Sequence, residues 1–304
     1  MMMTGYHAVY AGGYFDGIDV AKDNGFEFVQ FDLGVPGFFL DGLSDDELRR
    51  IRDYAGHRDM RITFHAPGDN LGFFCDFPLI RAGIREQFKL ILRKANMLGA
   101  RHITIHPGSY SQFRKTGEQR EDVCSPYYEQ VFYDNVKYLT DNCGGVLVCV
   151  ENFGWDATAR RAIQKLMDEG NPLFLTLDIA KLYSGDSKIK QADYGFFLRN
   201  RARIREMHVH DKNSLGQHQT VGTGDIDFKP FQAFVNEDVY VNFEVRPVGA
   251  AKESKDNLLL IWDHLAERTD WVDELTRLLA GDAPDIDIKQ FKSDRLWEKY
   301  ENLK

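Results

Sequence analysis

The sequence predicts an α/β protein that forms a single closed (β/α)8 barrel of the TIM type. Three observations predict this fold. The chain has 304 residues, of which 43% are hydrophobic, and this suits one barrel of about 250 residues with extensions. Short apolar, β-rich runs alternate with segments of helical periodicity, which is typical of parallel βα units. Many open, doubly wound sheets carry a glycine-rich GxGxxG or GxxxxGK(S/T) loop after an early strand, and this sequence has neither motif.

Eight short runs are the predicted strands. Each is rich in apolar and β-branched or aromatic residues, and most are separated by a helix-like segment. Eight such units in a chain of this length favour a closed barrel over an open sheet. The predicted strands are 7–12, 26–33, 61–66, 101–106, 146–152, 173–178, 204–210 and 240–245.

Helices are predicted between these strands. Ser44 and Glu47 form a capping-box pattern that begins a helix through Tyr54. Apolar residues three and four apart predict a helix over 79–98, which Gly99 ends. The same periodicity predicts helices over 127–142, 157–169, 228–235 and 258–266. We expect a barrel over 1–280 and a charged extension over 281–304, which either packs on the barrel or contributes to a contact between subunits of a homo-oligomer.

Ionisable residues end each of the last six predicted strands. In a barrel, the carboxyl ends of the strands converge on one mouth, where active sites lie. Side chains two residues earlier point the same way, and there the sequence places mostly polar residues instead of Val, Ile or Leu. The strand-end residues are His65, His106, Glu151, Asp178, His208 and Glu244. The residues two positions earlier are Thr63, Thr104, Cys149, Thr176, Glu206 and Asn242.

Each strand-end residue taken alone has an ordinary explanation. A single histidine is often simply hydrogen-bonded, and a single aspartate often caps the next helix. Six of them at one mouth instead predict a bound cation, because a carboxylate that follows an apolar strand is costly to bury without a partner. Three or four carboxylate and imidazole ligands suit Mn²⁺, Mg²⁺, Co²⁺ or Zn²⁺. The absence of thiolates among them argues against a structural zinc site.

Composition excludes several other classes of protein. The formal net charge of −9 argues against a general nucleic-acid binder, which needs a basic face. The sequence contains no apolar run of about 20 residues, so it predicts no membrane span. The first ten residues lack the pattern of a signal peptide, and the four cysteines lack CxxC spacing. We therefore expect a cytoplasmic protein with reduced thiols.

Two neighbouring stretches resemble a known family. Residues 207–213 (MHVHDKN) and 218–228 (HQTVGTGDIDF) resemble the His-x-x-Asp turn, the later His and the Gly-x-Gly segment of the xylose isomerase-like barrel superfamily. Shorter pieces at 104–108, 150–152 and 243–247 add to this resemblance, which spans roughly residues 5–265. The superfamily holds sugar isomerases and epimerases together with endonuclease IV-type enzymes.

The resemblance implies roles for matching residues. It implies that Glu151, Asp178, His208 and Glu244 hold one divalent ion, as in the sugar epimerases. His65, His106 and His218 match residues that complete a multi-zinc site in the endonuclease branch. Two positions depart from the family pattern, because Lys181 stands where a histidine is common and Gly216 where the endonuclease branch has an aspartate. Both departures weaken the case for three zinc ions and leave the four-ligand site intact.

We therefore expect an isomerase or epimerase of carbohydrate metabolism that acts on a small sugar or polyol. The metal would stabilise an enediolate, while Glu151 and Glu244 transfer the proton. An apolar wall is expected from Phe73, Phe74, Phe153 and Trp155. The substrate-binding candidates are His65, His106, Lys181, His210, Lys212, His218 and Arg246. Three alternatives stay open, namely a keto-polyol dehydratase, an endonuclease IV-like zinc phosphodiesterase and a barrel without enzymatic activity.

Overall fold

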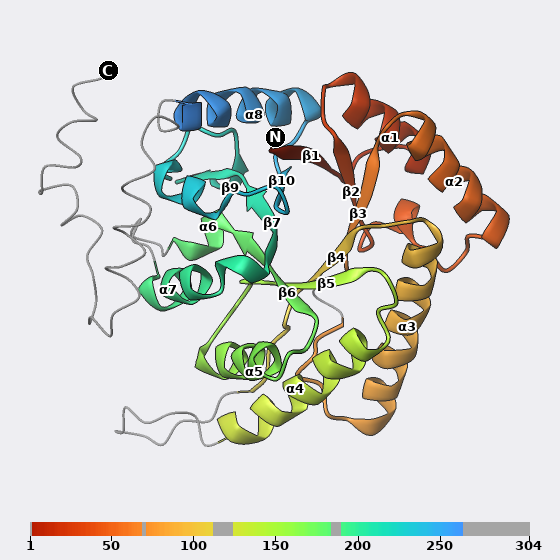
Figure 1. Ribbon diagram of the computed structural model, residues 1–304, viewed down its shortest axis with the longest axis vertical. Helices are drawn as coiled ribbons and strands as arrows, with labels where there is room; N and C mark the ends of the chain where they lie inside the picture. The colour runs from red at the N-terminus through yellow and green to blue at the C-terminus, as the bar shows by residue number, and fades with distance from the viewer. Residues whose placement is uncertain (1, 69–70, 112–123, 184–189, 264–304) are drawn as a thin grey trace, which may run out of the picture.

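Eight parallel strands close into a barrel in the computed structural model of the protein, which describes residues 2–68, 71–111, 124–183 and 190–263. The strand order is β1-β10-β7-β6-β5-β4-β3-β2, with β1 and β2 paired to complete the ring (Figure 1). The predicted (β/α)8 barrel is therefore confirmed. The strands are β1 (Met3–Ala8), β2 (Phe28–Asp32), β3 (Arg61–His65), β4 (His102–Ile105), β5 (Leu147–Glu151), β6 (Leu173–Asp178), β7 (Ile204–Val209) and β10 (Tyr240–Phe243).

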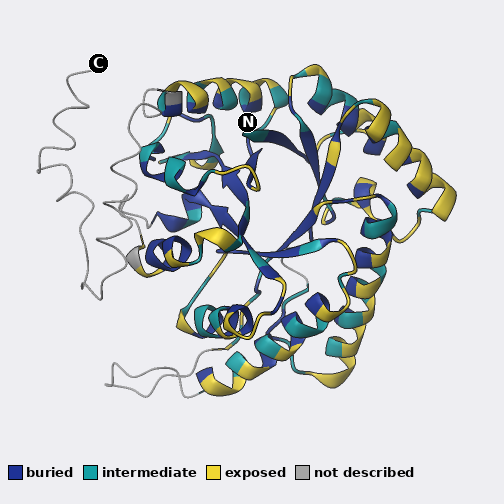
Figure 2. Ribbon diagram, in the orientation of Figure 1, coloured by how far each residue is buried: buried dark blue, intermediate teal, exposed yellow. Residues whose placement is uncertain are grey.

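Helices surround the ring of strands, and their outer faces carry most of the exposed residues (Figure 2). A short antiparallel hairpin, β8 (Asp211–Asn213) with β9 (Gly216–Gln219), follows β7 at the mouth of the barrel. The α-helices are α1 (Tyr14–Asp23), α2 (Asp45–His57), α3 (Pro78–Met97), α4 (Ser125–Asp141), α5 (Ala157–Asp168), α6 (Ile179–Leu182), α7 (Gln191–Arg199) and α8 (Val248–Asp263). The 3₁₀ helices are η1 (Pro36–Phe38), η2 (Arg201–Arg203) and η3 (Lys229–Phe234).

Local sequence signals explain where several helices begin. Ser44 accepts a hydrogen bond from the Glu47 backbone N–H, and the Glu47 side chain accepts one from the Ser44 backbone, so the predicted capping box at α2 is confirmed. Pro78 occupies the first turn of α3, where a missing N–H costs nothing. Asp156 caps α5 by accepting from the Ala159 N–H.

Three elements differ from the sequence prediction. The first strand is Met3–Ala8 and not 7–12, because the apolar run after Ala8 forms the turn into α1, where Tyr10 is 78% exposed. The segment predicted as a helix over 228–235 is instead the 3₁₀ helix η3, which has Pro230 in its first turn. The last helix, α8, begins at Val248 instead of at residue 258. The predicted extension over 281–304 lies outside the described residues.

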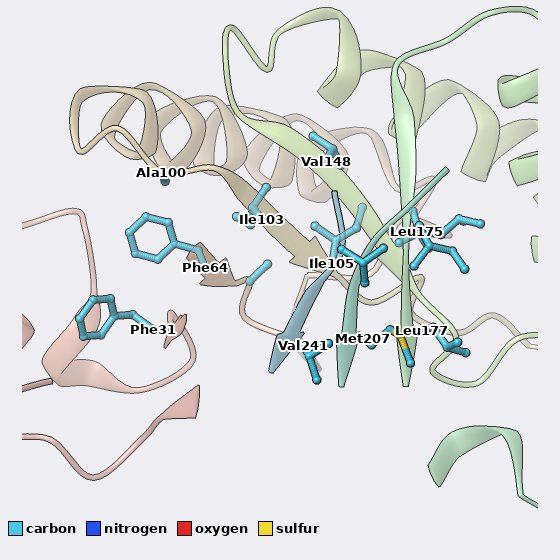
Figure 3. Close-up of a cluster of buried hydrophobic side chains, with 14 of the residues drawn as sticks. Phe31, Phe64, Ala100, Ile103, Ile105, Val148, Leu175, Leu177, Met207 and Val241 are labelled. Carbon is cyan, nitrogen blue, oxygen red and sulfur yellow. The ribbon is translucent and has the colours of Figure 1, made fainter. Parts of the chain in front are cut away.

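The strands bury both of their faces. Apolar side chains on the outer face of the ring pack under the helices and form the core, part of which is drawn in Figure 3 with Phe64, Ile103, Val148, Leu175 and Met207 among its labelled members. The alternate residues point into the barrel. These inward-pointing residues include the polar side chains that the sequence predicted for the interior. The strand register places them near the mouth of the barrel. No helix among the described residues is long and apolar enough to cross a membrane.

Candidate metal centre

Four acidic or imidazole side chains lie at the carboxyl ends of four strands. Glu151 ends β5, Asp178 ends β6, His208 lies near the end of β7, and Glu244 directly follows β10. The strand register pairs Asp178 with His208 across β6 and β7. All four side chains are buried, with exposed fractions of 2%, 0%, 0% and 5% in that order. Residues that are far apart in the sequence are thus neighbours here.

The imidazole of His208 lies between two of these carboxylates. Its Nδ1 is 3.4 Å from Glu151 Oε2 and 3.3 Å from Glu244 Oε1. Glu151, Asp178 and His208 also offer ligand atoms that all lie within 4.8 Å of one another. Yet neither ring nitrogen of His208, Nδ1 or Nε2, makes a hydrogen bond of normal geometry to any described residue. A buried nitrogen that faces two carboxylates without such a bond is what an ion-binding position requires.

Two further histidines contact Glu151. His106 Nε2 lies 3.0 Å and His65 Nε2 lies 3.3 Å from Glu151 Oε2. Burial alone would raise the pKa of Glu151, but the imidazoles of His106 and His208 hold it well below its usual range. Burial lowers the pKa of His65, and the stronger combined attraction of Glu151 and nearby carboxylates raises it to about 9. Glu151 is therefore an ionised carboxylate that lies beside the cationic ring of His65.

Glu244 has a partner that the sequence prediction missed. His7 Nδ1 lies 3.1 Å from Glu244 Oε1, and its Nε2 lies 3.6 Å from Asp32 Oδ2. Arg246 Nη2 lies 3.2 Å from His7 Nδ1, which places the guanidinium at this side of the mouth. Asp32 could have been found, since it follows an apolar strand in the same way as the other strand-end residues. His7 was missed because the first strand was placed too late.

Asp178 is held in place from two directions. Its backbone N–H donates to Asn152 Oδ1 at 2.7 Å, and its carbonyl accepts from Asn152 Nδ2 at 2.9 Å. Its Oδ1 accepts from the Lys181 backbone N–H at 3.0 Å, so Asp178 also caps α6. The ordinary capping explanation therefore holds for one oxygen. The other oxygen, Oδ2, faces His210 Nε2 at 3.4 Å and Lys181 Nζ at 3.6 Å.

His210 and His218 form a close pair of tilted rings beside Glu244. Their ring centroids are 4.3 Å apart, and the His218 backbone N–H donates to His210 Nδ1 at 3.0 Å. His218 Nδ1 lies 2.9 Å from the Glu244 carbonyl oxygen. Burial, reinforced by His210, lowers the pKa of His218 to about 4, so this ring is neutral at pH 7.

One buried carboxylate organises the segment that carries His218. Asp211 accepts backbone hydrogen bonds from Lys212 (2.8 Å), Gly222 (2.9 Å), Gly224 (2.9 Å) and Ile226 (3.2 Å). A Cβ atom at Gly224 would lie only 2.3 Å from Asp211 Oδ1, which explains the need for glycine there. The Asp211 and Gly-x-Gly parts of this pattern therefore have a structural basis in a stabilised turn, whereas its first residue, His208, lies in the candidate metal centre.

Beneath His208 lies a buried polar cluster around Glu206. Its Oε1 accepts from Gln30 Nε2 at 2.8 Å, and its Oε2 accepts from Thr104 Oγ1 at 2.5 Å. His102 Nε2 lies 3.1 Å from the same Oε2. Thr104 Oγ1 is also 2.7 Å from Thr176 Oγ1. These contacts confirm the predicted inward orientation of Thr104 and Thr176, and they show that Glu206, for which the strand register was left open, also points inward.

Of the four residues predicted to form an aromatic wall, Phe153 lies at the mouth of the barrel. Phe153 stacks on His106 at a centroid distance of 4.3 Å and an interplanar angle of 7°, and Lys181 Nζ lies 5.4 Å from its centre. Phe73 instead packs on Phe88 in the core. Trp155 packs on Phe196 and Phe197 of α7, and Phe74 lines a cleft beside His106.

The two lysines predicted to bind substrate, Lys181 and Lys212, lie in different surroundings. Lys181 donates to Gln217 Oε1 at 2.5 Å in addition to facing Asp178, so its ammonium lies at the rim of the site. Lys212 is half-buried on β8, where its backbone N–H donates to Asp211. Its role toward a substrate stays a prediction.

A model of the xylose isomerase-like TIM barrel family matches residues 18–260. The chain belongs to this family. No curated protein matches the sequence. The fold is similar to solved structures of a D-tagatose 3-epimerase-like protein (16% identity, TM-score 0.67, 88% of this chain and 99% of that chain). It is also similar to D-psicose 3-epimerase with D-tagatose from Clostridium cellulolyticum H10 (14%, 0.62, 91% and 99%) and to the IolI protein with a bound zinc atom (15%, 0.67, 86% and 99%).

These identities are low, so the similarity to solved structures establishes the fold of a xylose isomerase-like barrel and not its reaction. The ligand chemistry is an independent observation. Three carboxylates and one imidazole suit a divalent ion such as Mn²⁺, Mg²⁺, Co²⁺ or Zn²⁺. The residues present, including the Nδ1 atom of His208 without a regular hydrogen bond, fit such an ion.

Proposed function

We propose that the protein is a divalent-metal-dependent isomerase or epimerase of a sugar or sugar derivative. The observation that carries the proposal is the placement of Glu151 and Glu244, which approach the same His208 nitrogen from two different strands at 3.4 and 3.3 Å. Together with Asp178 they would hold one ion. That ion would polarise a substrate carbonyl and the hydroxyl beside it, which acidifies the hydrogen on the carbon between them.

Glu151 and Glu244 would exchange that proton. Both are buried, and the pKa of each is held well below its usual range by neighbouring imidazoles despite the opposing effect of burial. Each is therefore in the ionised form that accepts a proton. Two bases on two sides of one substrate carbon can remove a proton from one face and return it to the other, which inverts the centre. A single base would return it to the same face.

The remaining polar residues at the mouth would bind and orient the substrate oxygens. Lys181 offers the ammonium nearest to Asp178, and Arg246 offers a guanidinium on the Glu244 side. His65, His106, His210 and His218 surround the two proton-transferring carboxylates. Phe153 presents an apolar ring against which the C–H face of a sugar can pack.

Several similar solved structures carry names that support this reaction class. They include D-psicose 3-epimerase, D-allulose 3-epimerase and L-ribulose 3-epimerase, at 14–17% identity. The IolI structure is described as having a bound zinc atom. These names belong to those proteins, and they favour a sugar substrate and a metal ion for this chain within a shared fold.

Solvent hydrogen exchange tests the proposal. A panel of ketoses and aldoses is incubated in D₂O with protein loaded with Mn²⁺, Co²⁺, Mg²⁺ or Zn²⁺, and NMR follows deuterium at the carbon beside the carbonyl. We expect exchange and formation of an epimer or isomer without loss of water. Loss of water would instead indicate a dehydratase. Exchange that proceeds equally with wild-type protein and with E151Q or E244Q would contradict the assigned roles, and the exposed E237Q is the matched control.

A second candidate function rests on His65 and His106. Their Nε2 atoms and Glu151 form a second trio whose ligand atoms lie within 4.8 Å of one another. A second ion bound there would favour the zinc phosphodiesterase alternative. Lys181, Gly216 and the net charge of −9 favour the single-ion reaction. Elemental analysis distinguishes the two, since one ion per chain supports the isomerase, whereas two or three zinc ions with cleavage of abasic-site DNA support the phosphodiesterase.

A further inference from the structure

A cleft of about 790 Å³ opens beside the metal centre. It runs outward from His106 and Phe153 between the segment that follows β3 and the segment that follows β4. Its volume is in the range of pockets that bury drug-sized ligands. The sugar at the metal centre would occupy the His106 end, which leaves the outer part of the cleft for another group.

The walls of this cleft are mainly aromatic. Several rings stand in contact with one another, with Phe74 and Tyr110 centroids 4.9 Å apart and Tyr110 and Tyr128 centroids 4.5 Å apart. At the outer end, Phe77 is 73% and Tyr127 is 55% exposed. The aromatic lining residues are Phe74, Phe77, Tyr110, Tyr127, Tyr128 and Phe153. Large exposed rings beside a concave site indicate a ligand that covers them.

Two of the tyrosine hydroxyls already bind protein partners. The Tyr110 hydroxyl donates to Asp156 Oδ2 and contacts Thr158 Oγ1, both at 2.8 Å. The Tyr127 hydroxyl donates to Asp76, whose carboxylate also pairs with Arg81 at 2.6 Å. These rings therefore offer their faces to the cleft more than their polar groups. A second sugar, which needs many hydrogen-bond partners, fits these walls less well than a flat apolar group does.

The inner part of the cleft has a fixed backbone. Gly108 has φ +80°, and a Cβ there would lie 2.6 Å from Gly72 Cα, so the two segments cross in direct backbone contact. The Phe73 N–H donates to the Pro107 carbonyl at 3.0 Å. Asn135 of α4 donates to the Phe73 carbonyl at 2.8 Å. The inner part of the cleft is thus preformed, and a ligand would not have to order it.

The charge of the lining residues further restricts the class of ligand that the cleft can bind. The described residues that line the cleft include no lysine or arginine, and the Asp76 carboxylate is already paired. A phosphate at the outer end would therefore find no lysine or arginine among the described lining residues. From this lining we infer that the cleft binds an uncharged aryl group joined to the sugar, so that the substrate of the proposed reaction is an aryl-substituted sugar derivative. This inference rests on the proposed function, because the metal centre fixes where the sugar lies.

Binding of paired glycosides tests the inference. Calorimetry on metal-loaded full-length protein compares methyl, phenyl, 4-nitrophenyl and 2-naphthyl glycosides of glucose, which are acetals without a carbonyl and so report binding without turnover, and saturation-transfer NMR detects contact with the aryl protons. We expect aryl glycosides to bind at least ~10-fold more tightly than methyl glycosides. Equal affinity for both kinds, or no saturation transfer to any aryl group, would overturn the inference.

Variants locate the aryl group. Phe77→Ala and Tyr127→Ala should remove most of the aryl advantage while leaving metal affinity unchanged. Leu79→Ala is the matched control, because Leu79 lies in the first turn of α3, two residues after Phe77, is 89% exposed and does not line the cleft. An aryl advantage that survives both variants would place the aryl group elsewhere and refute the inference.

The two proposals fail separately. Tight aryl binding without hydrogen exchange in any sugar would leave the cleft assignment standing and refute the isomerase. Hydrogen exchange in free sugars, with no increase in affinity from an aryl group, would support the isomerase and refute the cleft assignment.

Discussion

Glu206 Oε2 lies 3.4 Å from His208 Nε2, on the opposite side of the imidazole from the Glu151 and Glu244 carboxylates of the candidate metal centre. Both side chains are fully buried. Burial alone would raise the pKa of Glu206, but His102 and His208 hold it well below its usual range. An ionised Glu206 favours the His208 tautomer with a proton on Nε2, which leaves Nδ1 free to bind an ion.

Replacing Glu206 should therefore weaken metal binding. We expect Glu206→Gln to lower the affinity for Mn²⁺ by roughly 10–100-fold, because loss of a carboxylate behind a ligating histidine has this typical cost. Calorimetric titration with Mn²⁺ measures it. Thr63→Val is the matched control in the same barrel interior, since Thr63 Oγ1 is buried and makes no hydrogen bond to a described residue. Unchanged affinity in Glu206→Gln would show that Glu206 does not orient His208.

Lys181 should affect the ion and the substrate in opposite directions. Its Nζ is 3.6 Å from Asp178 Oδ2 and so repels a nearby cation. Lys181→Met should raise Mn²⁺ affinity several-fold, roughly 3–10-fold, while it raises KM for the substrate because an oxygen-binding group is lost. Lys137→Met is the control, because Lys137 pairs with Asp141 on α4. Weaker metal binding in Lys181→Met would contradict this electrostatic role.

Asp211 should matter mainly for stability. Asp211→Asn keeps the size of the side chain but replaces one carboxylate oxygen with an NH2 donor, so two of the four backbone N–H groups that Asp211 binds lose their acceptor. We expect the free energy of unfolding to fall by about 2–3 kcal/mol, and His218 to lose its position beside Glu244. Urea denaturation measures the first effect, and the NMR signal of the His218 ring reports the second. An unchanged free energy of unfolding would mean that the turn does not depend on this carboxylate.

Asp32 should contribute a pH-dependent part of the stability. Burial alone would raise its pKa, but His7 and then His65 lower it from 3.8 to about 2. Because the folded-state pKa is depressed, the contribution is present above pH 3.8 and is lost as the pH falls toward 2. Asp32→Asn should cost roughly 1–2 kcal/mol at pH 7, with the difference from wild type shrinking between pH 4 and pH 2. Urea denaturation across this range measures the difference, and a gap that stays constant would exclude the mechanism.

Much of the barrel was predictable because local patterns and the strand register agree. The run Val146–Val150 predicts a buried strand, and the polar residue that follows it must then lie at the mouth. The capping box at Ser44 works in the same way, since it depends on residues only three positions apart. These predictions need no knowledge of long-range contacts.

What the sequence did not predict depends on such contacts. His7 looked like the beginning of a strand, because the apolar residues after it hid the turn into α1. Glu206 was expected to point inward, but its bonds to Gln30 and Thr104 join strands that are distant in sequence. Trp155 and Phe73 are residue types that often form a sugar-binding wall. In the structure, Trp155 instead packs on Phe197 of α7, and Phe73 packs on Phe88 of α3.

The anomalous scattering of crystals grown with Mn²⁺ tests the central claim most directly. The account predicts one strong anomalous peak bound at about 2.0–2.3 Å by Glu151, Asp178, His208 Nδ1 and Glu244. Crystals of Asp178→Asn should show a weaker peak at the same place. An anomalous map with no peak among these four side chains, or with the ion bound elsewhere in the barrel, would contradict the account.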